Sequence, residues 1–228
     1  MRGAPAHTFR QGGRSYPRPV TTQDAWLTPD DREPAAAADR FIGVDATVGD
    51  FWQFALGDLR MNAARGHLGE FLVGKALGLE RLRRVEWDAY DLLLDDGDGG
   101  ITIEVKTSAY LQAWDQRRPS AIKFTGLRGL RTHPRGGDDP AGRRMNAMVY
   151  VFCVQTATEH ATYDTLDVGQ WEFYVVPRSM LDNGVRQSIS ITPLRQLAGK
   201  PVRWRELGAA VRRAGAGERR DDDGPWWS

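Results

Sequence analysis

Hydrophobic and polar residues alternate strictly along ITIEVK at residues 101–106, a period of two that is typical of a half-buried β-strand. Its three apolar side chains therefore share one face, and Glu104 and Lys106 share the other. The residues before it, 95–100, are only aspartate and glycine, which strongly favour a turn. The apolar run at 92–94 then predicts the first strand of a β-hairpin.

The turn also predicts which residues of the hairpin lie opposite each other. If it is centred between Gly97 and Asp98, the antiparallel register pairs Asp91 with Glu104. Both carboxylates and the ammonium of Lys106 would then lie close together. Because two neighbouring carboxylates repel each other unless a cation lies between them, this face of the hairpin is the first candidate for chemistry.

The remaining pattern predicts helices and strands on both sides of the hairpin. Residues 147–155 are apolar almost throughout, which suits a central strand covered on both faces. The other expected strands are at 83–86, 121–125, 171–177 and 187–191, and the expected helical segments are 47–59 (capped at Thr47 or Asp50), 62–77 (ended by Gly78), 178–181, 194–197 (capped at Thr192) and 204–213. This order predicts an α/β fold, a mixed β-sheet of about five or six strands flanked by helices.

Length and composition predict one domain with two tails. The chain has 228 residues, of which 41% are hydrophobic, enough for one good core. Residues 1–40 are expected to be a disordered or loosely docked arm, 41–213 the domain and 214–228 a disordered tail. No apolar run reaches the roughly 18–20 residues that span a bilayer, and no export signal is visible, so a cytoplasmic protein without membrane contact is expected. The single cysteine, Cys153, fits a buried structural thiol.

Charge is distributed unevenly, although the formal net charge is only +1. The stretch 117–144 holds eight basic residues against two acids, and it follows the charged hairpin directly. A basic patch there is expected to contact phosphate groups. For its part at 132–142, which is rich in glycine and proline, a solvated loop is the alternative.

Asp91, Glu104 and Lys106 suggest metal-assisted hydrolysis. Mg²⁺ takes oxygen ligands, commonly one or two carboxylates, a carbonyl and waters, and Asp91, Glu104 and the carbonyl of Val105 could supply them. Lys106 could orient or help deprotonate the attacking water and offset charge that develops on a phosphorane-like transition state. The expected cofactor is Mg²⁺, with Mn²⁺ as a substitute.

Asp91 together with the triplet EVK at 104–106 resembles the PD-(D/E)xK motif of nucleases with the restriction-endonuclease-like fold. Tyr90 stands where the family often has proline. Many members carry a glutamate on the preceding helix, and Glu70 is similarly placed. The resemblance covers residues 50–125 and is to a bacterial branch of the superfamily. It implies a restriction-endonuclease-like core and Mg²⁺-dependent DNA cleavage, with Glu70 as an accessory acid.

The resemblance also directs attention to nucleic-acid contacts after the hairpin, where the candidates are Thr107, Ser108, Gln112, Arg117, Arg118 and Lys123. DNA is the expected partner, with RNA not excluded. Cutting both strands would need two sites, which a homodimer would supply.

Several alternatives stay open at the level of sequence. Asp88 could replace Asp91 as the metal ligand, and Glu70 could instead form a salt bridge with Arg65 or with a neighbouring strand. The domain could bind nucleic acid or a protein without catalysis, or the hairpin could be a solvated surface feature. Substrate form, sequence preference and the choice between endonuclease and exonuclease activity do not follow from the sequence.

Overall fold

The computed structural model describes residues 33–80, 89–95, 97, 100–132, 137–183 and 187–220. The chain divides into two units, 1–34 and 35–228, and every element below belongs to the second. The expected strand at 83–86 and the alternative metal ligand Asp88 both lie outside the described residues. Among the helices that are described, none combines the length and the apolar character needed to cross a membrane.

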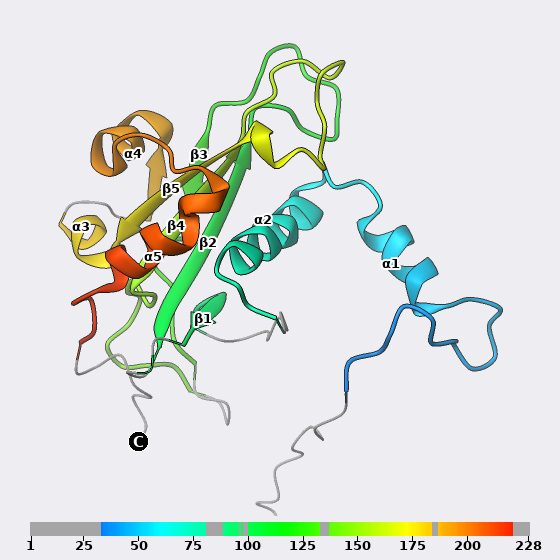
Figure 1. The fold of residues 1–228 in the computed structure, drawn as a ribbon, viewed down its shortest axis with the longest axis horizontal. Helices are drawn as coiled ribbons and strands as arrows, with labels where there is room; N and C mark the ends of the chain where they lie inside the picture. Colours follow the sequence, from blue (N-terminus) through cyan, green and yellow to red (C-terminus); the bar gives the residue numbers. More distant parts are fainter. Residues whose placement is uncertain are drawn as a thin grey trace, which may run out of the picture. The chain divides into compact units, whose positions relative to one another are not determined.

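The described strands form two sheets (Figure 1). The main sheet has the order β1-β2-β4-β5, with β1 (Leu92–Leu94), β2 (Ile101–Ala109), β4 (Val149–Gln155) and β5 (Trp171–Pro177). The β2–β4 pair is parallel and the other two pairs are antiparallel, so the sheet is mixed. A second, two-stranded sheet pairs β3 (Lys123–Thr125) with β6 (Ser188–Ser190). The α/β class is confirmed, but the strands are divided between two sheets.

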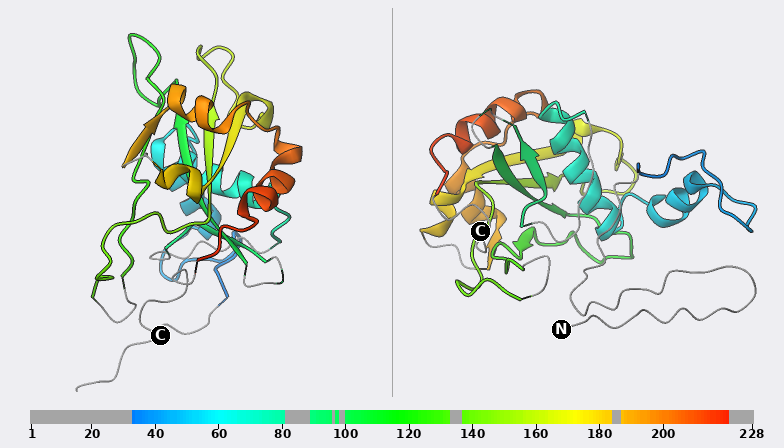
Figure 2. Two further views of the ribbon diagram at one scale, coloured as in Figure 1. Left: turned by 90° about the vertical axis from the view of Figure 1, so that its left-hand side faces the viewer. Right: turned by 90° about the horizontal axis from the view of Figure 1, so that it is seen from below.

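Helices cover both faces of the main sheet (Figures 1 and 2). The helices are α1 (Val48–Leu56), α2 (Asn62–Ala76), α3 (Arg178–Asp182), α4 (Ile191–Ala198) and α5 (Leu207–Gly215), with short 3-10 turns at Val168–Gln170 and Trp204–Glu206. Side chains of α2 and α5 pack on one face, and α3, α4, β3 and β6 contribute to the core on the other. All seven residues of β4 are buried, which confirms the central strand.

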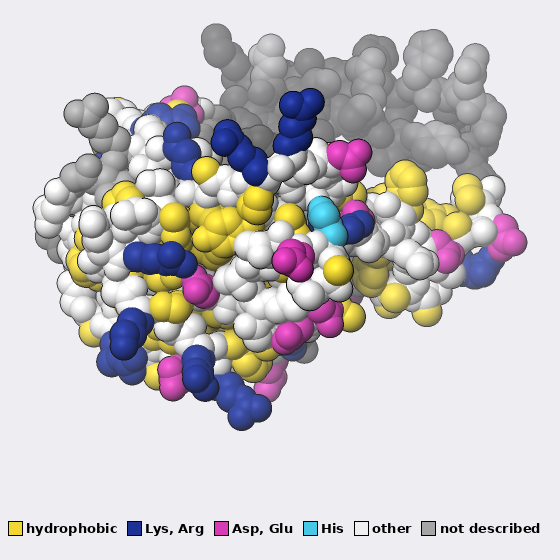
Figure 3. Space-filling view, turned by 90° about the horizontal axis from the view of Figure 1, so that it is seen from above, with side chains coloured by type: hydrophobic (Ala, Val, Ile, Leu, Met, Phe, Trp, Pro, Cys, Tyr) yellow, Lys and Arg dark blue, Asp and Glu magenta, His cyan; other side chains and the backbone are white. Residues whose placement is uncertain are grey.

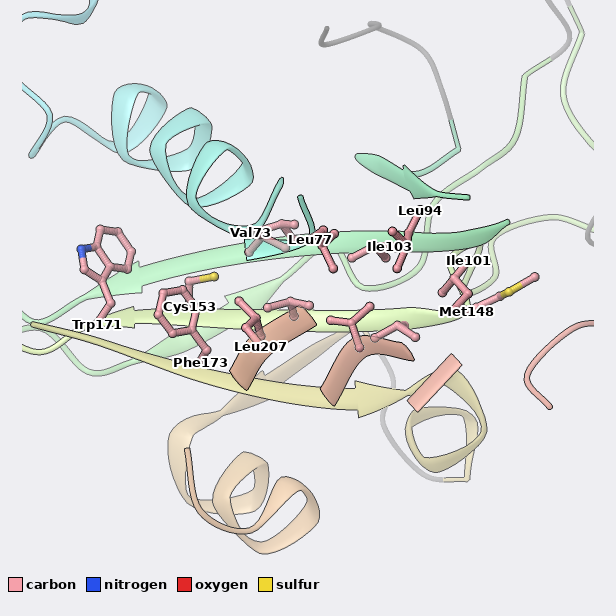
Figure 4. Packing of buried hydrophobic residues seen from close by; sticks show 14 residues of the cluster. Val73, Leu77, Leu94, Ile101, Ile103, Met148, Cys153, Trp171, Phe173 and Leu207 are labelled. Carbon is pink, nitrogen blue, oxygen red and sulfur yellow. The ribbon is translucent and has the colours of Figure 1, made fainter. Parts of the chain in front are cut away.

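The core between the main sheet and α2 and α5 is apolar (Figure 4). Val73 of α2 and Leu207 of α5 are fully buried, as are Ile103 of β2 and Phe173 of β5. Cys153 lies in the same cluster and is buried, as the sequence predicted. The odd-numbered side chains of β2 therefore face this core, and its even-numbered side chains face the opposite side of the sheet.

The helix ends follow local signals, with two departures. Thr47 caps α1, accepting from the Asp50 N–H while the Asp50 carboxylate accepts from the Thr47 N–H, which confirms the predicted cap. Gly78, with φ of 78°, follows the end of α2 as predicted. The α4 helix has Ser190 rather than Thr192 at its N-cap. The segment 68–79 is apolar on nearly every side in the sequence, which predicts burial against more than one neighbour, but Phe71 of α2 is half exposed.

The segment after α5 differs from the expected tail. The Arg178 guanidinium donates to the carbonyl of Glu218, whose carboxylate accepts from the Ser179 N–H at 2.9 Å. Arg219 donates to the carbonyl of Gly100 at 3.1 Å. Residues 216–220 therefore connect α3 with the start of β2, because they bond to both.

Candidate active site

Asp91 lies where the sequence predicted it, at the end of the hairpin register. Leu92 pairs with Ile103, and extending that register by one residue places Asp91 opposite Glu104. The Asp91 N–H donates to the Ile103 carbonyl at 3.0 Å. Its carboxylate Oδ2 accepts from the Val105 N–H at 2.7 Å. The paired part of β1 begins only at Leu92. The Val105 N–H therefore has the side-chain carboxylate of Asp91 as its acceptor instead of a backbone carbonyl of β1.

This bond also orients the Val105 carbonyl. The N–H and C=O of one strand residue point toward the same side of the strand. Since the Val105 N–H points to Asp91, its carbonyl faces the same edge of the sheet. Two of the three predicted metal-ligating groups, the Asp91 carboxylate and the Val105 carbonyl, therefore face one edge.

Glu104 and Lys106 lie together on the even-numbered face of β2. The Lys106 Nζ donates to Glu104 Oε1 at 2.5 Å, and both side chains are largely buried. Hydrogen bonds between ionised groups in such surroundings are shorter and stronger than neutral ones. The pair fixes the ammonium of Lys106 beside the carboxylate.

The electrostatic environment of Glu104 is unusual for a carboxyl group. The pKa of Glu104 is raised to about 7, mainly by burial and then by the negative charge of Asp91. Lys106 opposes this rise through its charge and hydrogen bond, and Glu70 adds a smaller increase. The site therefore carries more negative charge than Lys106 offsets, which favours the binding of a cation.

Glu70 reaches this neighbourhood because α2 packs very closely on β2. A Cβ added to Gly69 would lie 2.2 Å from Cγ2 of Thr107, so only glycine allows this approach. Glu70 is the next residue and is half-buried. Its charge acts on Glu104, as the pKa of Glu104 indicates.

The side chains define which ligand set could hold a metal. Within the described parts of the chain, no three His, Cys, Asp or Glu side chains gather closely enough to hold an ion. Glu70 therefore does not join Asp91 and Glu104 as a third carboxylate ligand. Two carboxylates and one carbonyl remain, an all-oxygen set that suits Mg²⁺, which retains several waters when bound to proteins.

A cavity of about 160 Å³ adjoins the two carboxylates, and it includes residues that sequence reasoning missed. Its lining residues are Ala89, Asp91, Glu104, Gly126, Leu127, Gly129, Leu130, Asn146 and Tyr150. Tyr150 pairs with Glu104 in the β2–β4 register, and its hydroxyl donates to the Leu127 carbonyl at 3.1 Å. Asn146 Oδ1 is buried and has no hydrogen-bond partner among the described residues. This amide oxygen can accept from a donor that enters the cavity.

One feature of the sequence could have indicated Tyr150, because it is the only side chain with a hydroxyl in the apolar run 148–154. No feature of the sequence indicates Asn146, because its position depends on the parallel pairing of β2 with β4.

The predicted nucleic-acid contacts differ in their surroundings. Arg117, Arg118 and Lys123 are exposed, and Ser108 is half-buried. Thr107 faces Gly69 of α2. Gln112 is buried: its amide oxygen accepts from Arg65 at 3.1 Å and its amide nitrogen donates to the Ala109 carbonyl at 3.0 Å. Its side chain therefore bonds to the end of β2. It was predicted to contact nucleic acid at the surface, but it is buried.

The basic patch is partly neutralised within the protein. Arg128 pairs with Asp182 at 3.1 Å, and Arg131 pairs with Asp139 at 2.5 Å. Residues 133–136 of this stretch lie outside the described residues. The exposed cations of the patch nearest in sequence to the hairpin are therefore Arg117, Arg118 and Lys123.

Comparisons with known proteins give little guidance. No family model matches this chain, and no curated protein matches its sequence significantly. The solved structure of the bacterial homing endonuclease I-Ssp6803I aligns with 70% of this chain and 99% of its own, at 17% sequence identity and a TM-score of 0.39. A likeness of this strength assigns neither a family nor a function to the chain.

Proposed function

We propose that this protein is a metal-dependent nuclease that hydrolyses phosphodiester bonds of DNA by metal-activated water, with RNA as a further substrate class to test. The observation that carries the proposal is that Asp91 and Glu104 line one cavity and that Lys106 is bonded to Glu104. Two carboxylates and one ammonium are the residue types that phosphodiester hydrolysis needs, since they combine a cation site with a positive charge beside it.

The proposed ligands are the carboxylates of Asp91 and Glu104 and the carbonyl of Val105. Bound Mg²⁺ or Mn²⁺ would polarise the phosphoryl group and lower the pKa of a bound water. The raised pKa of Glu104 supports a cation here, because the charge of a bound ion would offset the repulsion from Asp91. The unpartnered oxygen of Asn146 beside the same cavity offers a further acceptor for water or substrate.

Each remaining residue has a role that its position permits. Lys106 orients the attacking water and offsets the negative charge that develops on the phosphate. The Val105 N–H holds the Asp91 carboxylate in place. Glu70 acts as an accessory acid on water molecules near Glu104. We place Ser108, Arg117, Arg118 and Lys123 along the path of the nucleic-acid backbone. Thr107, which faces α2, and the buried Gln112 support this path from behind.

The test is a titration of Mg²⁺ and Mn²⁺ into the full chain with labelled linear, nicked, branched and single-stranded DNA, and RNA. We expect Lys106→Ala to reduce cleavage by roughly 10²-fold or more, because the positioned cation is lost. The matched control is Lys200→Ala, which removes an exposed lysine outside the site and should leave cleavage unchanged. Equal cleavage by the wild type and Lys106→Ala would contradict the proposal.

One observation favours a second candidate, a nucleic-acid-binding module without turnover. The 2.5 Å ion pair joins Lys106 and Glu104 to each other, as it would in a structural hairpin. This alternative predicts DNA binding that persists in EDTA, with no cleavage of any substrate under Mg²⁺ or Mn²⁺. Calorimetric titration of Mg²⁺ into wild type and Asp91→Asn separates the two, since only a nuclease site should lose metal affinity in the variant.

A further inference from the structure

The α1 segment exposes an unusual amount of apolar side chain. The helix reads VGDFWQFAL, and none of its residues is buried. The loop before it, residues 41–44, is exposed as well. We define the α1 surface as the exposed large apolar residues of this region, Phe41, Ile42, Val44, Phe51, Trp52, Phe54 and Leu56. Figure 3 shows hydrophobic side chains gathered over this part of the molecule, on the right.

This helix is well formed and does not owe its exposure to fraying. Its first turn is fixed by the reciprocal cap between Thr47 and Asp50, with hydrogen bonds of 2.7 Å and 3.2 Å. The Thr47 carbonyl accepts from the Phe51 N–H at 3.2 Å, which closes the first helical turn. A capped helix whose aromatic side chains remain in water lacks the apolar contact that normally stabilises such a helix. An exposed apolar patch of this size indicates a binding surface.

The charges around the surface identify the class of partner. The α1 helix contains no Lys or Arg, whereas helices that lie on anionic membranes are rich in both. Nucleic acid would require cations for the same reason. Beside the helix, Arg40 pairs with Asp45 and Arg60 with Asp58, while the carboxylates of Asp39 and Asp50 accept hydrogen bonds from backbone N–H groups. The seven residues of the surface carry no charge themselves, so the surface fits an apolar protein partner, and a second copy presents one.

The area of the α1 surface is large enough for contact with a second copy of this chain. Aromatic side chains carry about 150–250 Å² each, so the exposed parts of these seven residues amount to roughly 600–800 Å². A standard interface buries about 800 Å² per partner. A two-fold contact places the same patch on both sides, and the seven uncharged apolar residues of this patch complement themselves.

We propose that the α1 surface pairs with the α1 surface of a second copy of this chain, forming a homodimer. This inference is independent of the proposed nuclease function, because it rests on α1 alone. If the protein is both a nuclease and a dimer, the dimer supplies two active sites for one duplex. The dimer contact would also lie close in sequence to the site, because α1 is followed by α2, which carries Glu70.

The first test measures the mass of the full chain by sedimentation equilibrium across roughly two orders of magnitude in concentration. Phe54 is 88% exposed, so Phe54→Ser removes apolar contact area without opening the core. We expect it to weaken dimerisation at least about tenfold. The control is Leu166→Ser, which removes a leucine that is 80% exposed elsewhere and should leave the dimer intact. A monomeric wild type, or a dimer that tolerates Phe54→Ser, would overturn the proposal.

A second test locates the contact without depending on affinity. Cys153 is buried, so Gln53→Cys places one accessible thiol on α1. We expect a short bismaleimide to link two Gln53→Cys chains, since a two-fold contact brings α1 close to its own copy. Leu166→Cys serves as the matched control and should stay unlinked. Equal linking of both variants would overturn the assignment to α1.

Discussion

Glu104 is largely buried and forms a short ion pair with Lys106. Burial raises the pKa of its carboxyl group, and the ion pair lowers it. Burial and the carboxylate of Asp91 disfavour the ionised form, whereas Lys106 favours it. The net result is a pKa of about 7, which means that burial and repulsion outweigh the ion pair. In the absence of a bound cation, ionised Glu104 therefore makes the fold less stable, as is common where a site is arranged for function.

Glu104→Gln is therefore expected to stabilise the protein at alkaline pH in buffer with EDTA. The pKa of Glu104 is about 7 in the fold against an ordinary 4.5, so the folded state binds more protons between these values. The free energy of unfolding of the wild type then falls as pH rises through this window. At pH 8 the variant should gain up to roughly 3 kcal/mol, and the gain should vanish below about pH 4.5. Urea unfolding at several pH values measures this.

The control for that experiment is Glu159→Gln, which changes an exposed carboxylate outside the site and should give no comparable pH-dependent gain. A Glu104→Gln protein that is less stable than the wild type at pH 8 would show that the ion pair with Lys106 outweighs burial.

At the residue scale, local pattern predicted the positions of Asp91 and Glu104 but not of the residues around them. The glycine-rich turn fixed the hairpin register, and the structure confirms that register. Tyr150 of β4 and Asn146, three residues before β4, line the cavity because the parallel pairing of β4 with β2 joins residues 46 positions apart. Gln112 had the residue type of a nucleic-acid contact, but its burial depends on Arg65, which no local pattern reveals.

At the scale of elements, the contact between α2 and β2 depends on one small residue. Gly69→Ala should destabilise the protein by about 1–3 kcal/mol, although alanine favours helix, because its Cβ would overlap Cγ2 of Thr107. Gly66→Ala is the matched control: nothing lies within 4 Å of its added Cβ, so a gain of about 1 kcal/mol is expected. Thermal and urea unfolding compare the two variants.

Adding Thr107→Ser to Gly69→Ala tests the cause. The serine lacks Cγ2, so the double variant should recover much of the lost stability. If the double variant is no more stable than Gly69→Ala, the close approach of α2 to β2 does not rest on this contact.

Element boundaries were predicted best where local signals are strong. The Thr47 cap, Gly78 after α2 and the apolar run of β4 each mark their element in the sequence, and all three are confirmed. The exposure of α1 was not predicted, because an apolar helix face looks the same in sequence whether it meets its own core or another chain.

At the scale of the whole molecule, the α/β class could be predicted from the sequence, but the division into two sheets could not. Strands β3 and β6 have three residues each and pair with one another across more than sixty positions of the chain. Strands this short carry little pairing preference of their own, so packing against β4 and β5 decides where they lie. The side chains of Phe124 and Ile189 bury these strands in the core on that face.

The C-terminal segment provides the last prediction at this scale, because it connects parts of the fold that are far apart in sequence. A chain that stops after Gly217 loses the Glu218 carbonyl, which accepts from the buried Arg178, and the Glu218 carboxylate, which accepts from Ser179. It also loses the bond from Arg219 to Gly100 at the start of β2. Removing an acceptor from a buried guanidinium is costly, so the free energy of unfolding should fall by about 1–3 kcal/mol.

A chain that stops after Arg220 keeps all three of these contacts and is the matched control, so it should be clearly more stable than the chain that stops after Gly217. Urea denaturation of the two truncated chains beside the full chain makes the comparison. Because Gly100 immediately precedes β2, the shorter chain should also loosen the hairpin that holds Asp91 and Glu104, and hydrogen exchange at the Val105 N–H should become faster. Equal stability and equal exchange in both truncated chains would show that residues 218–220 rest on the domain without supporting the site.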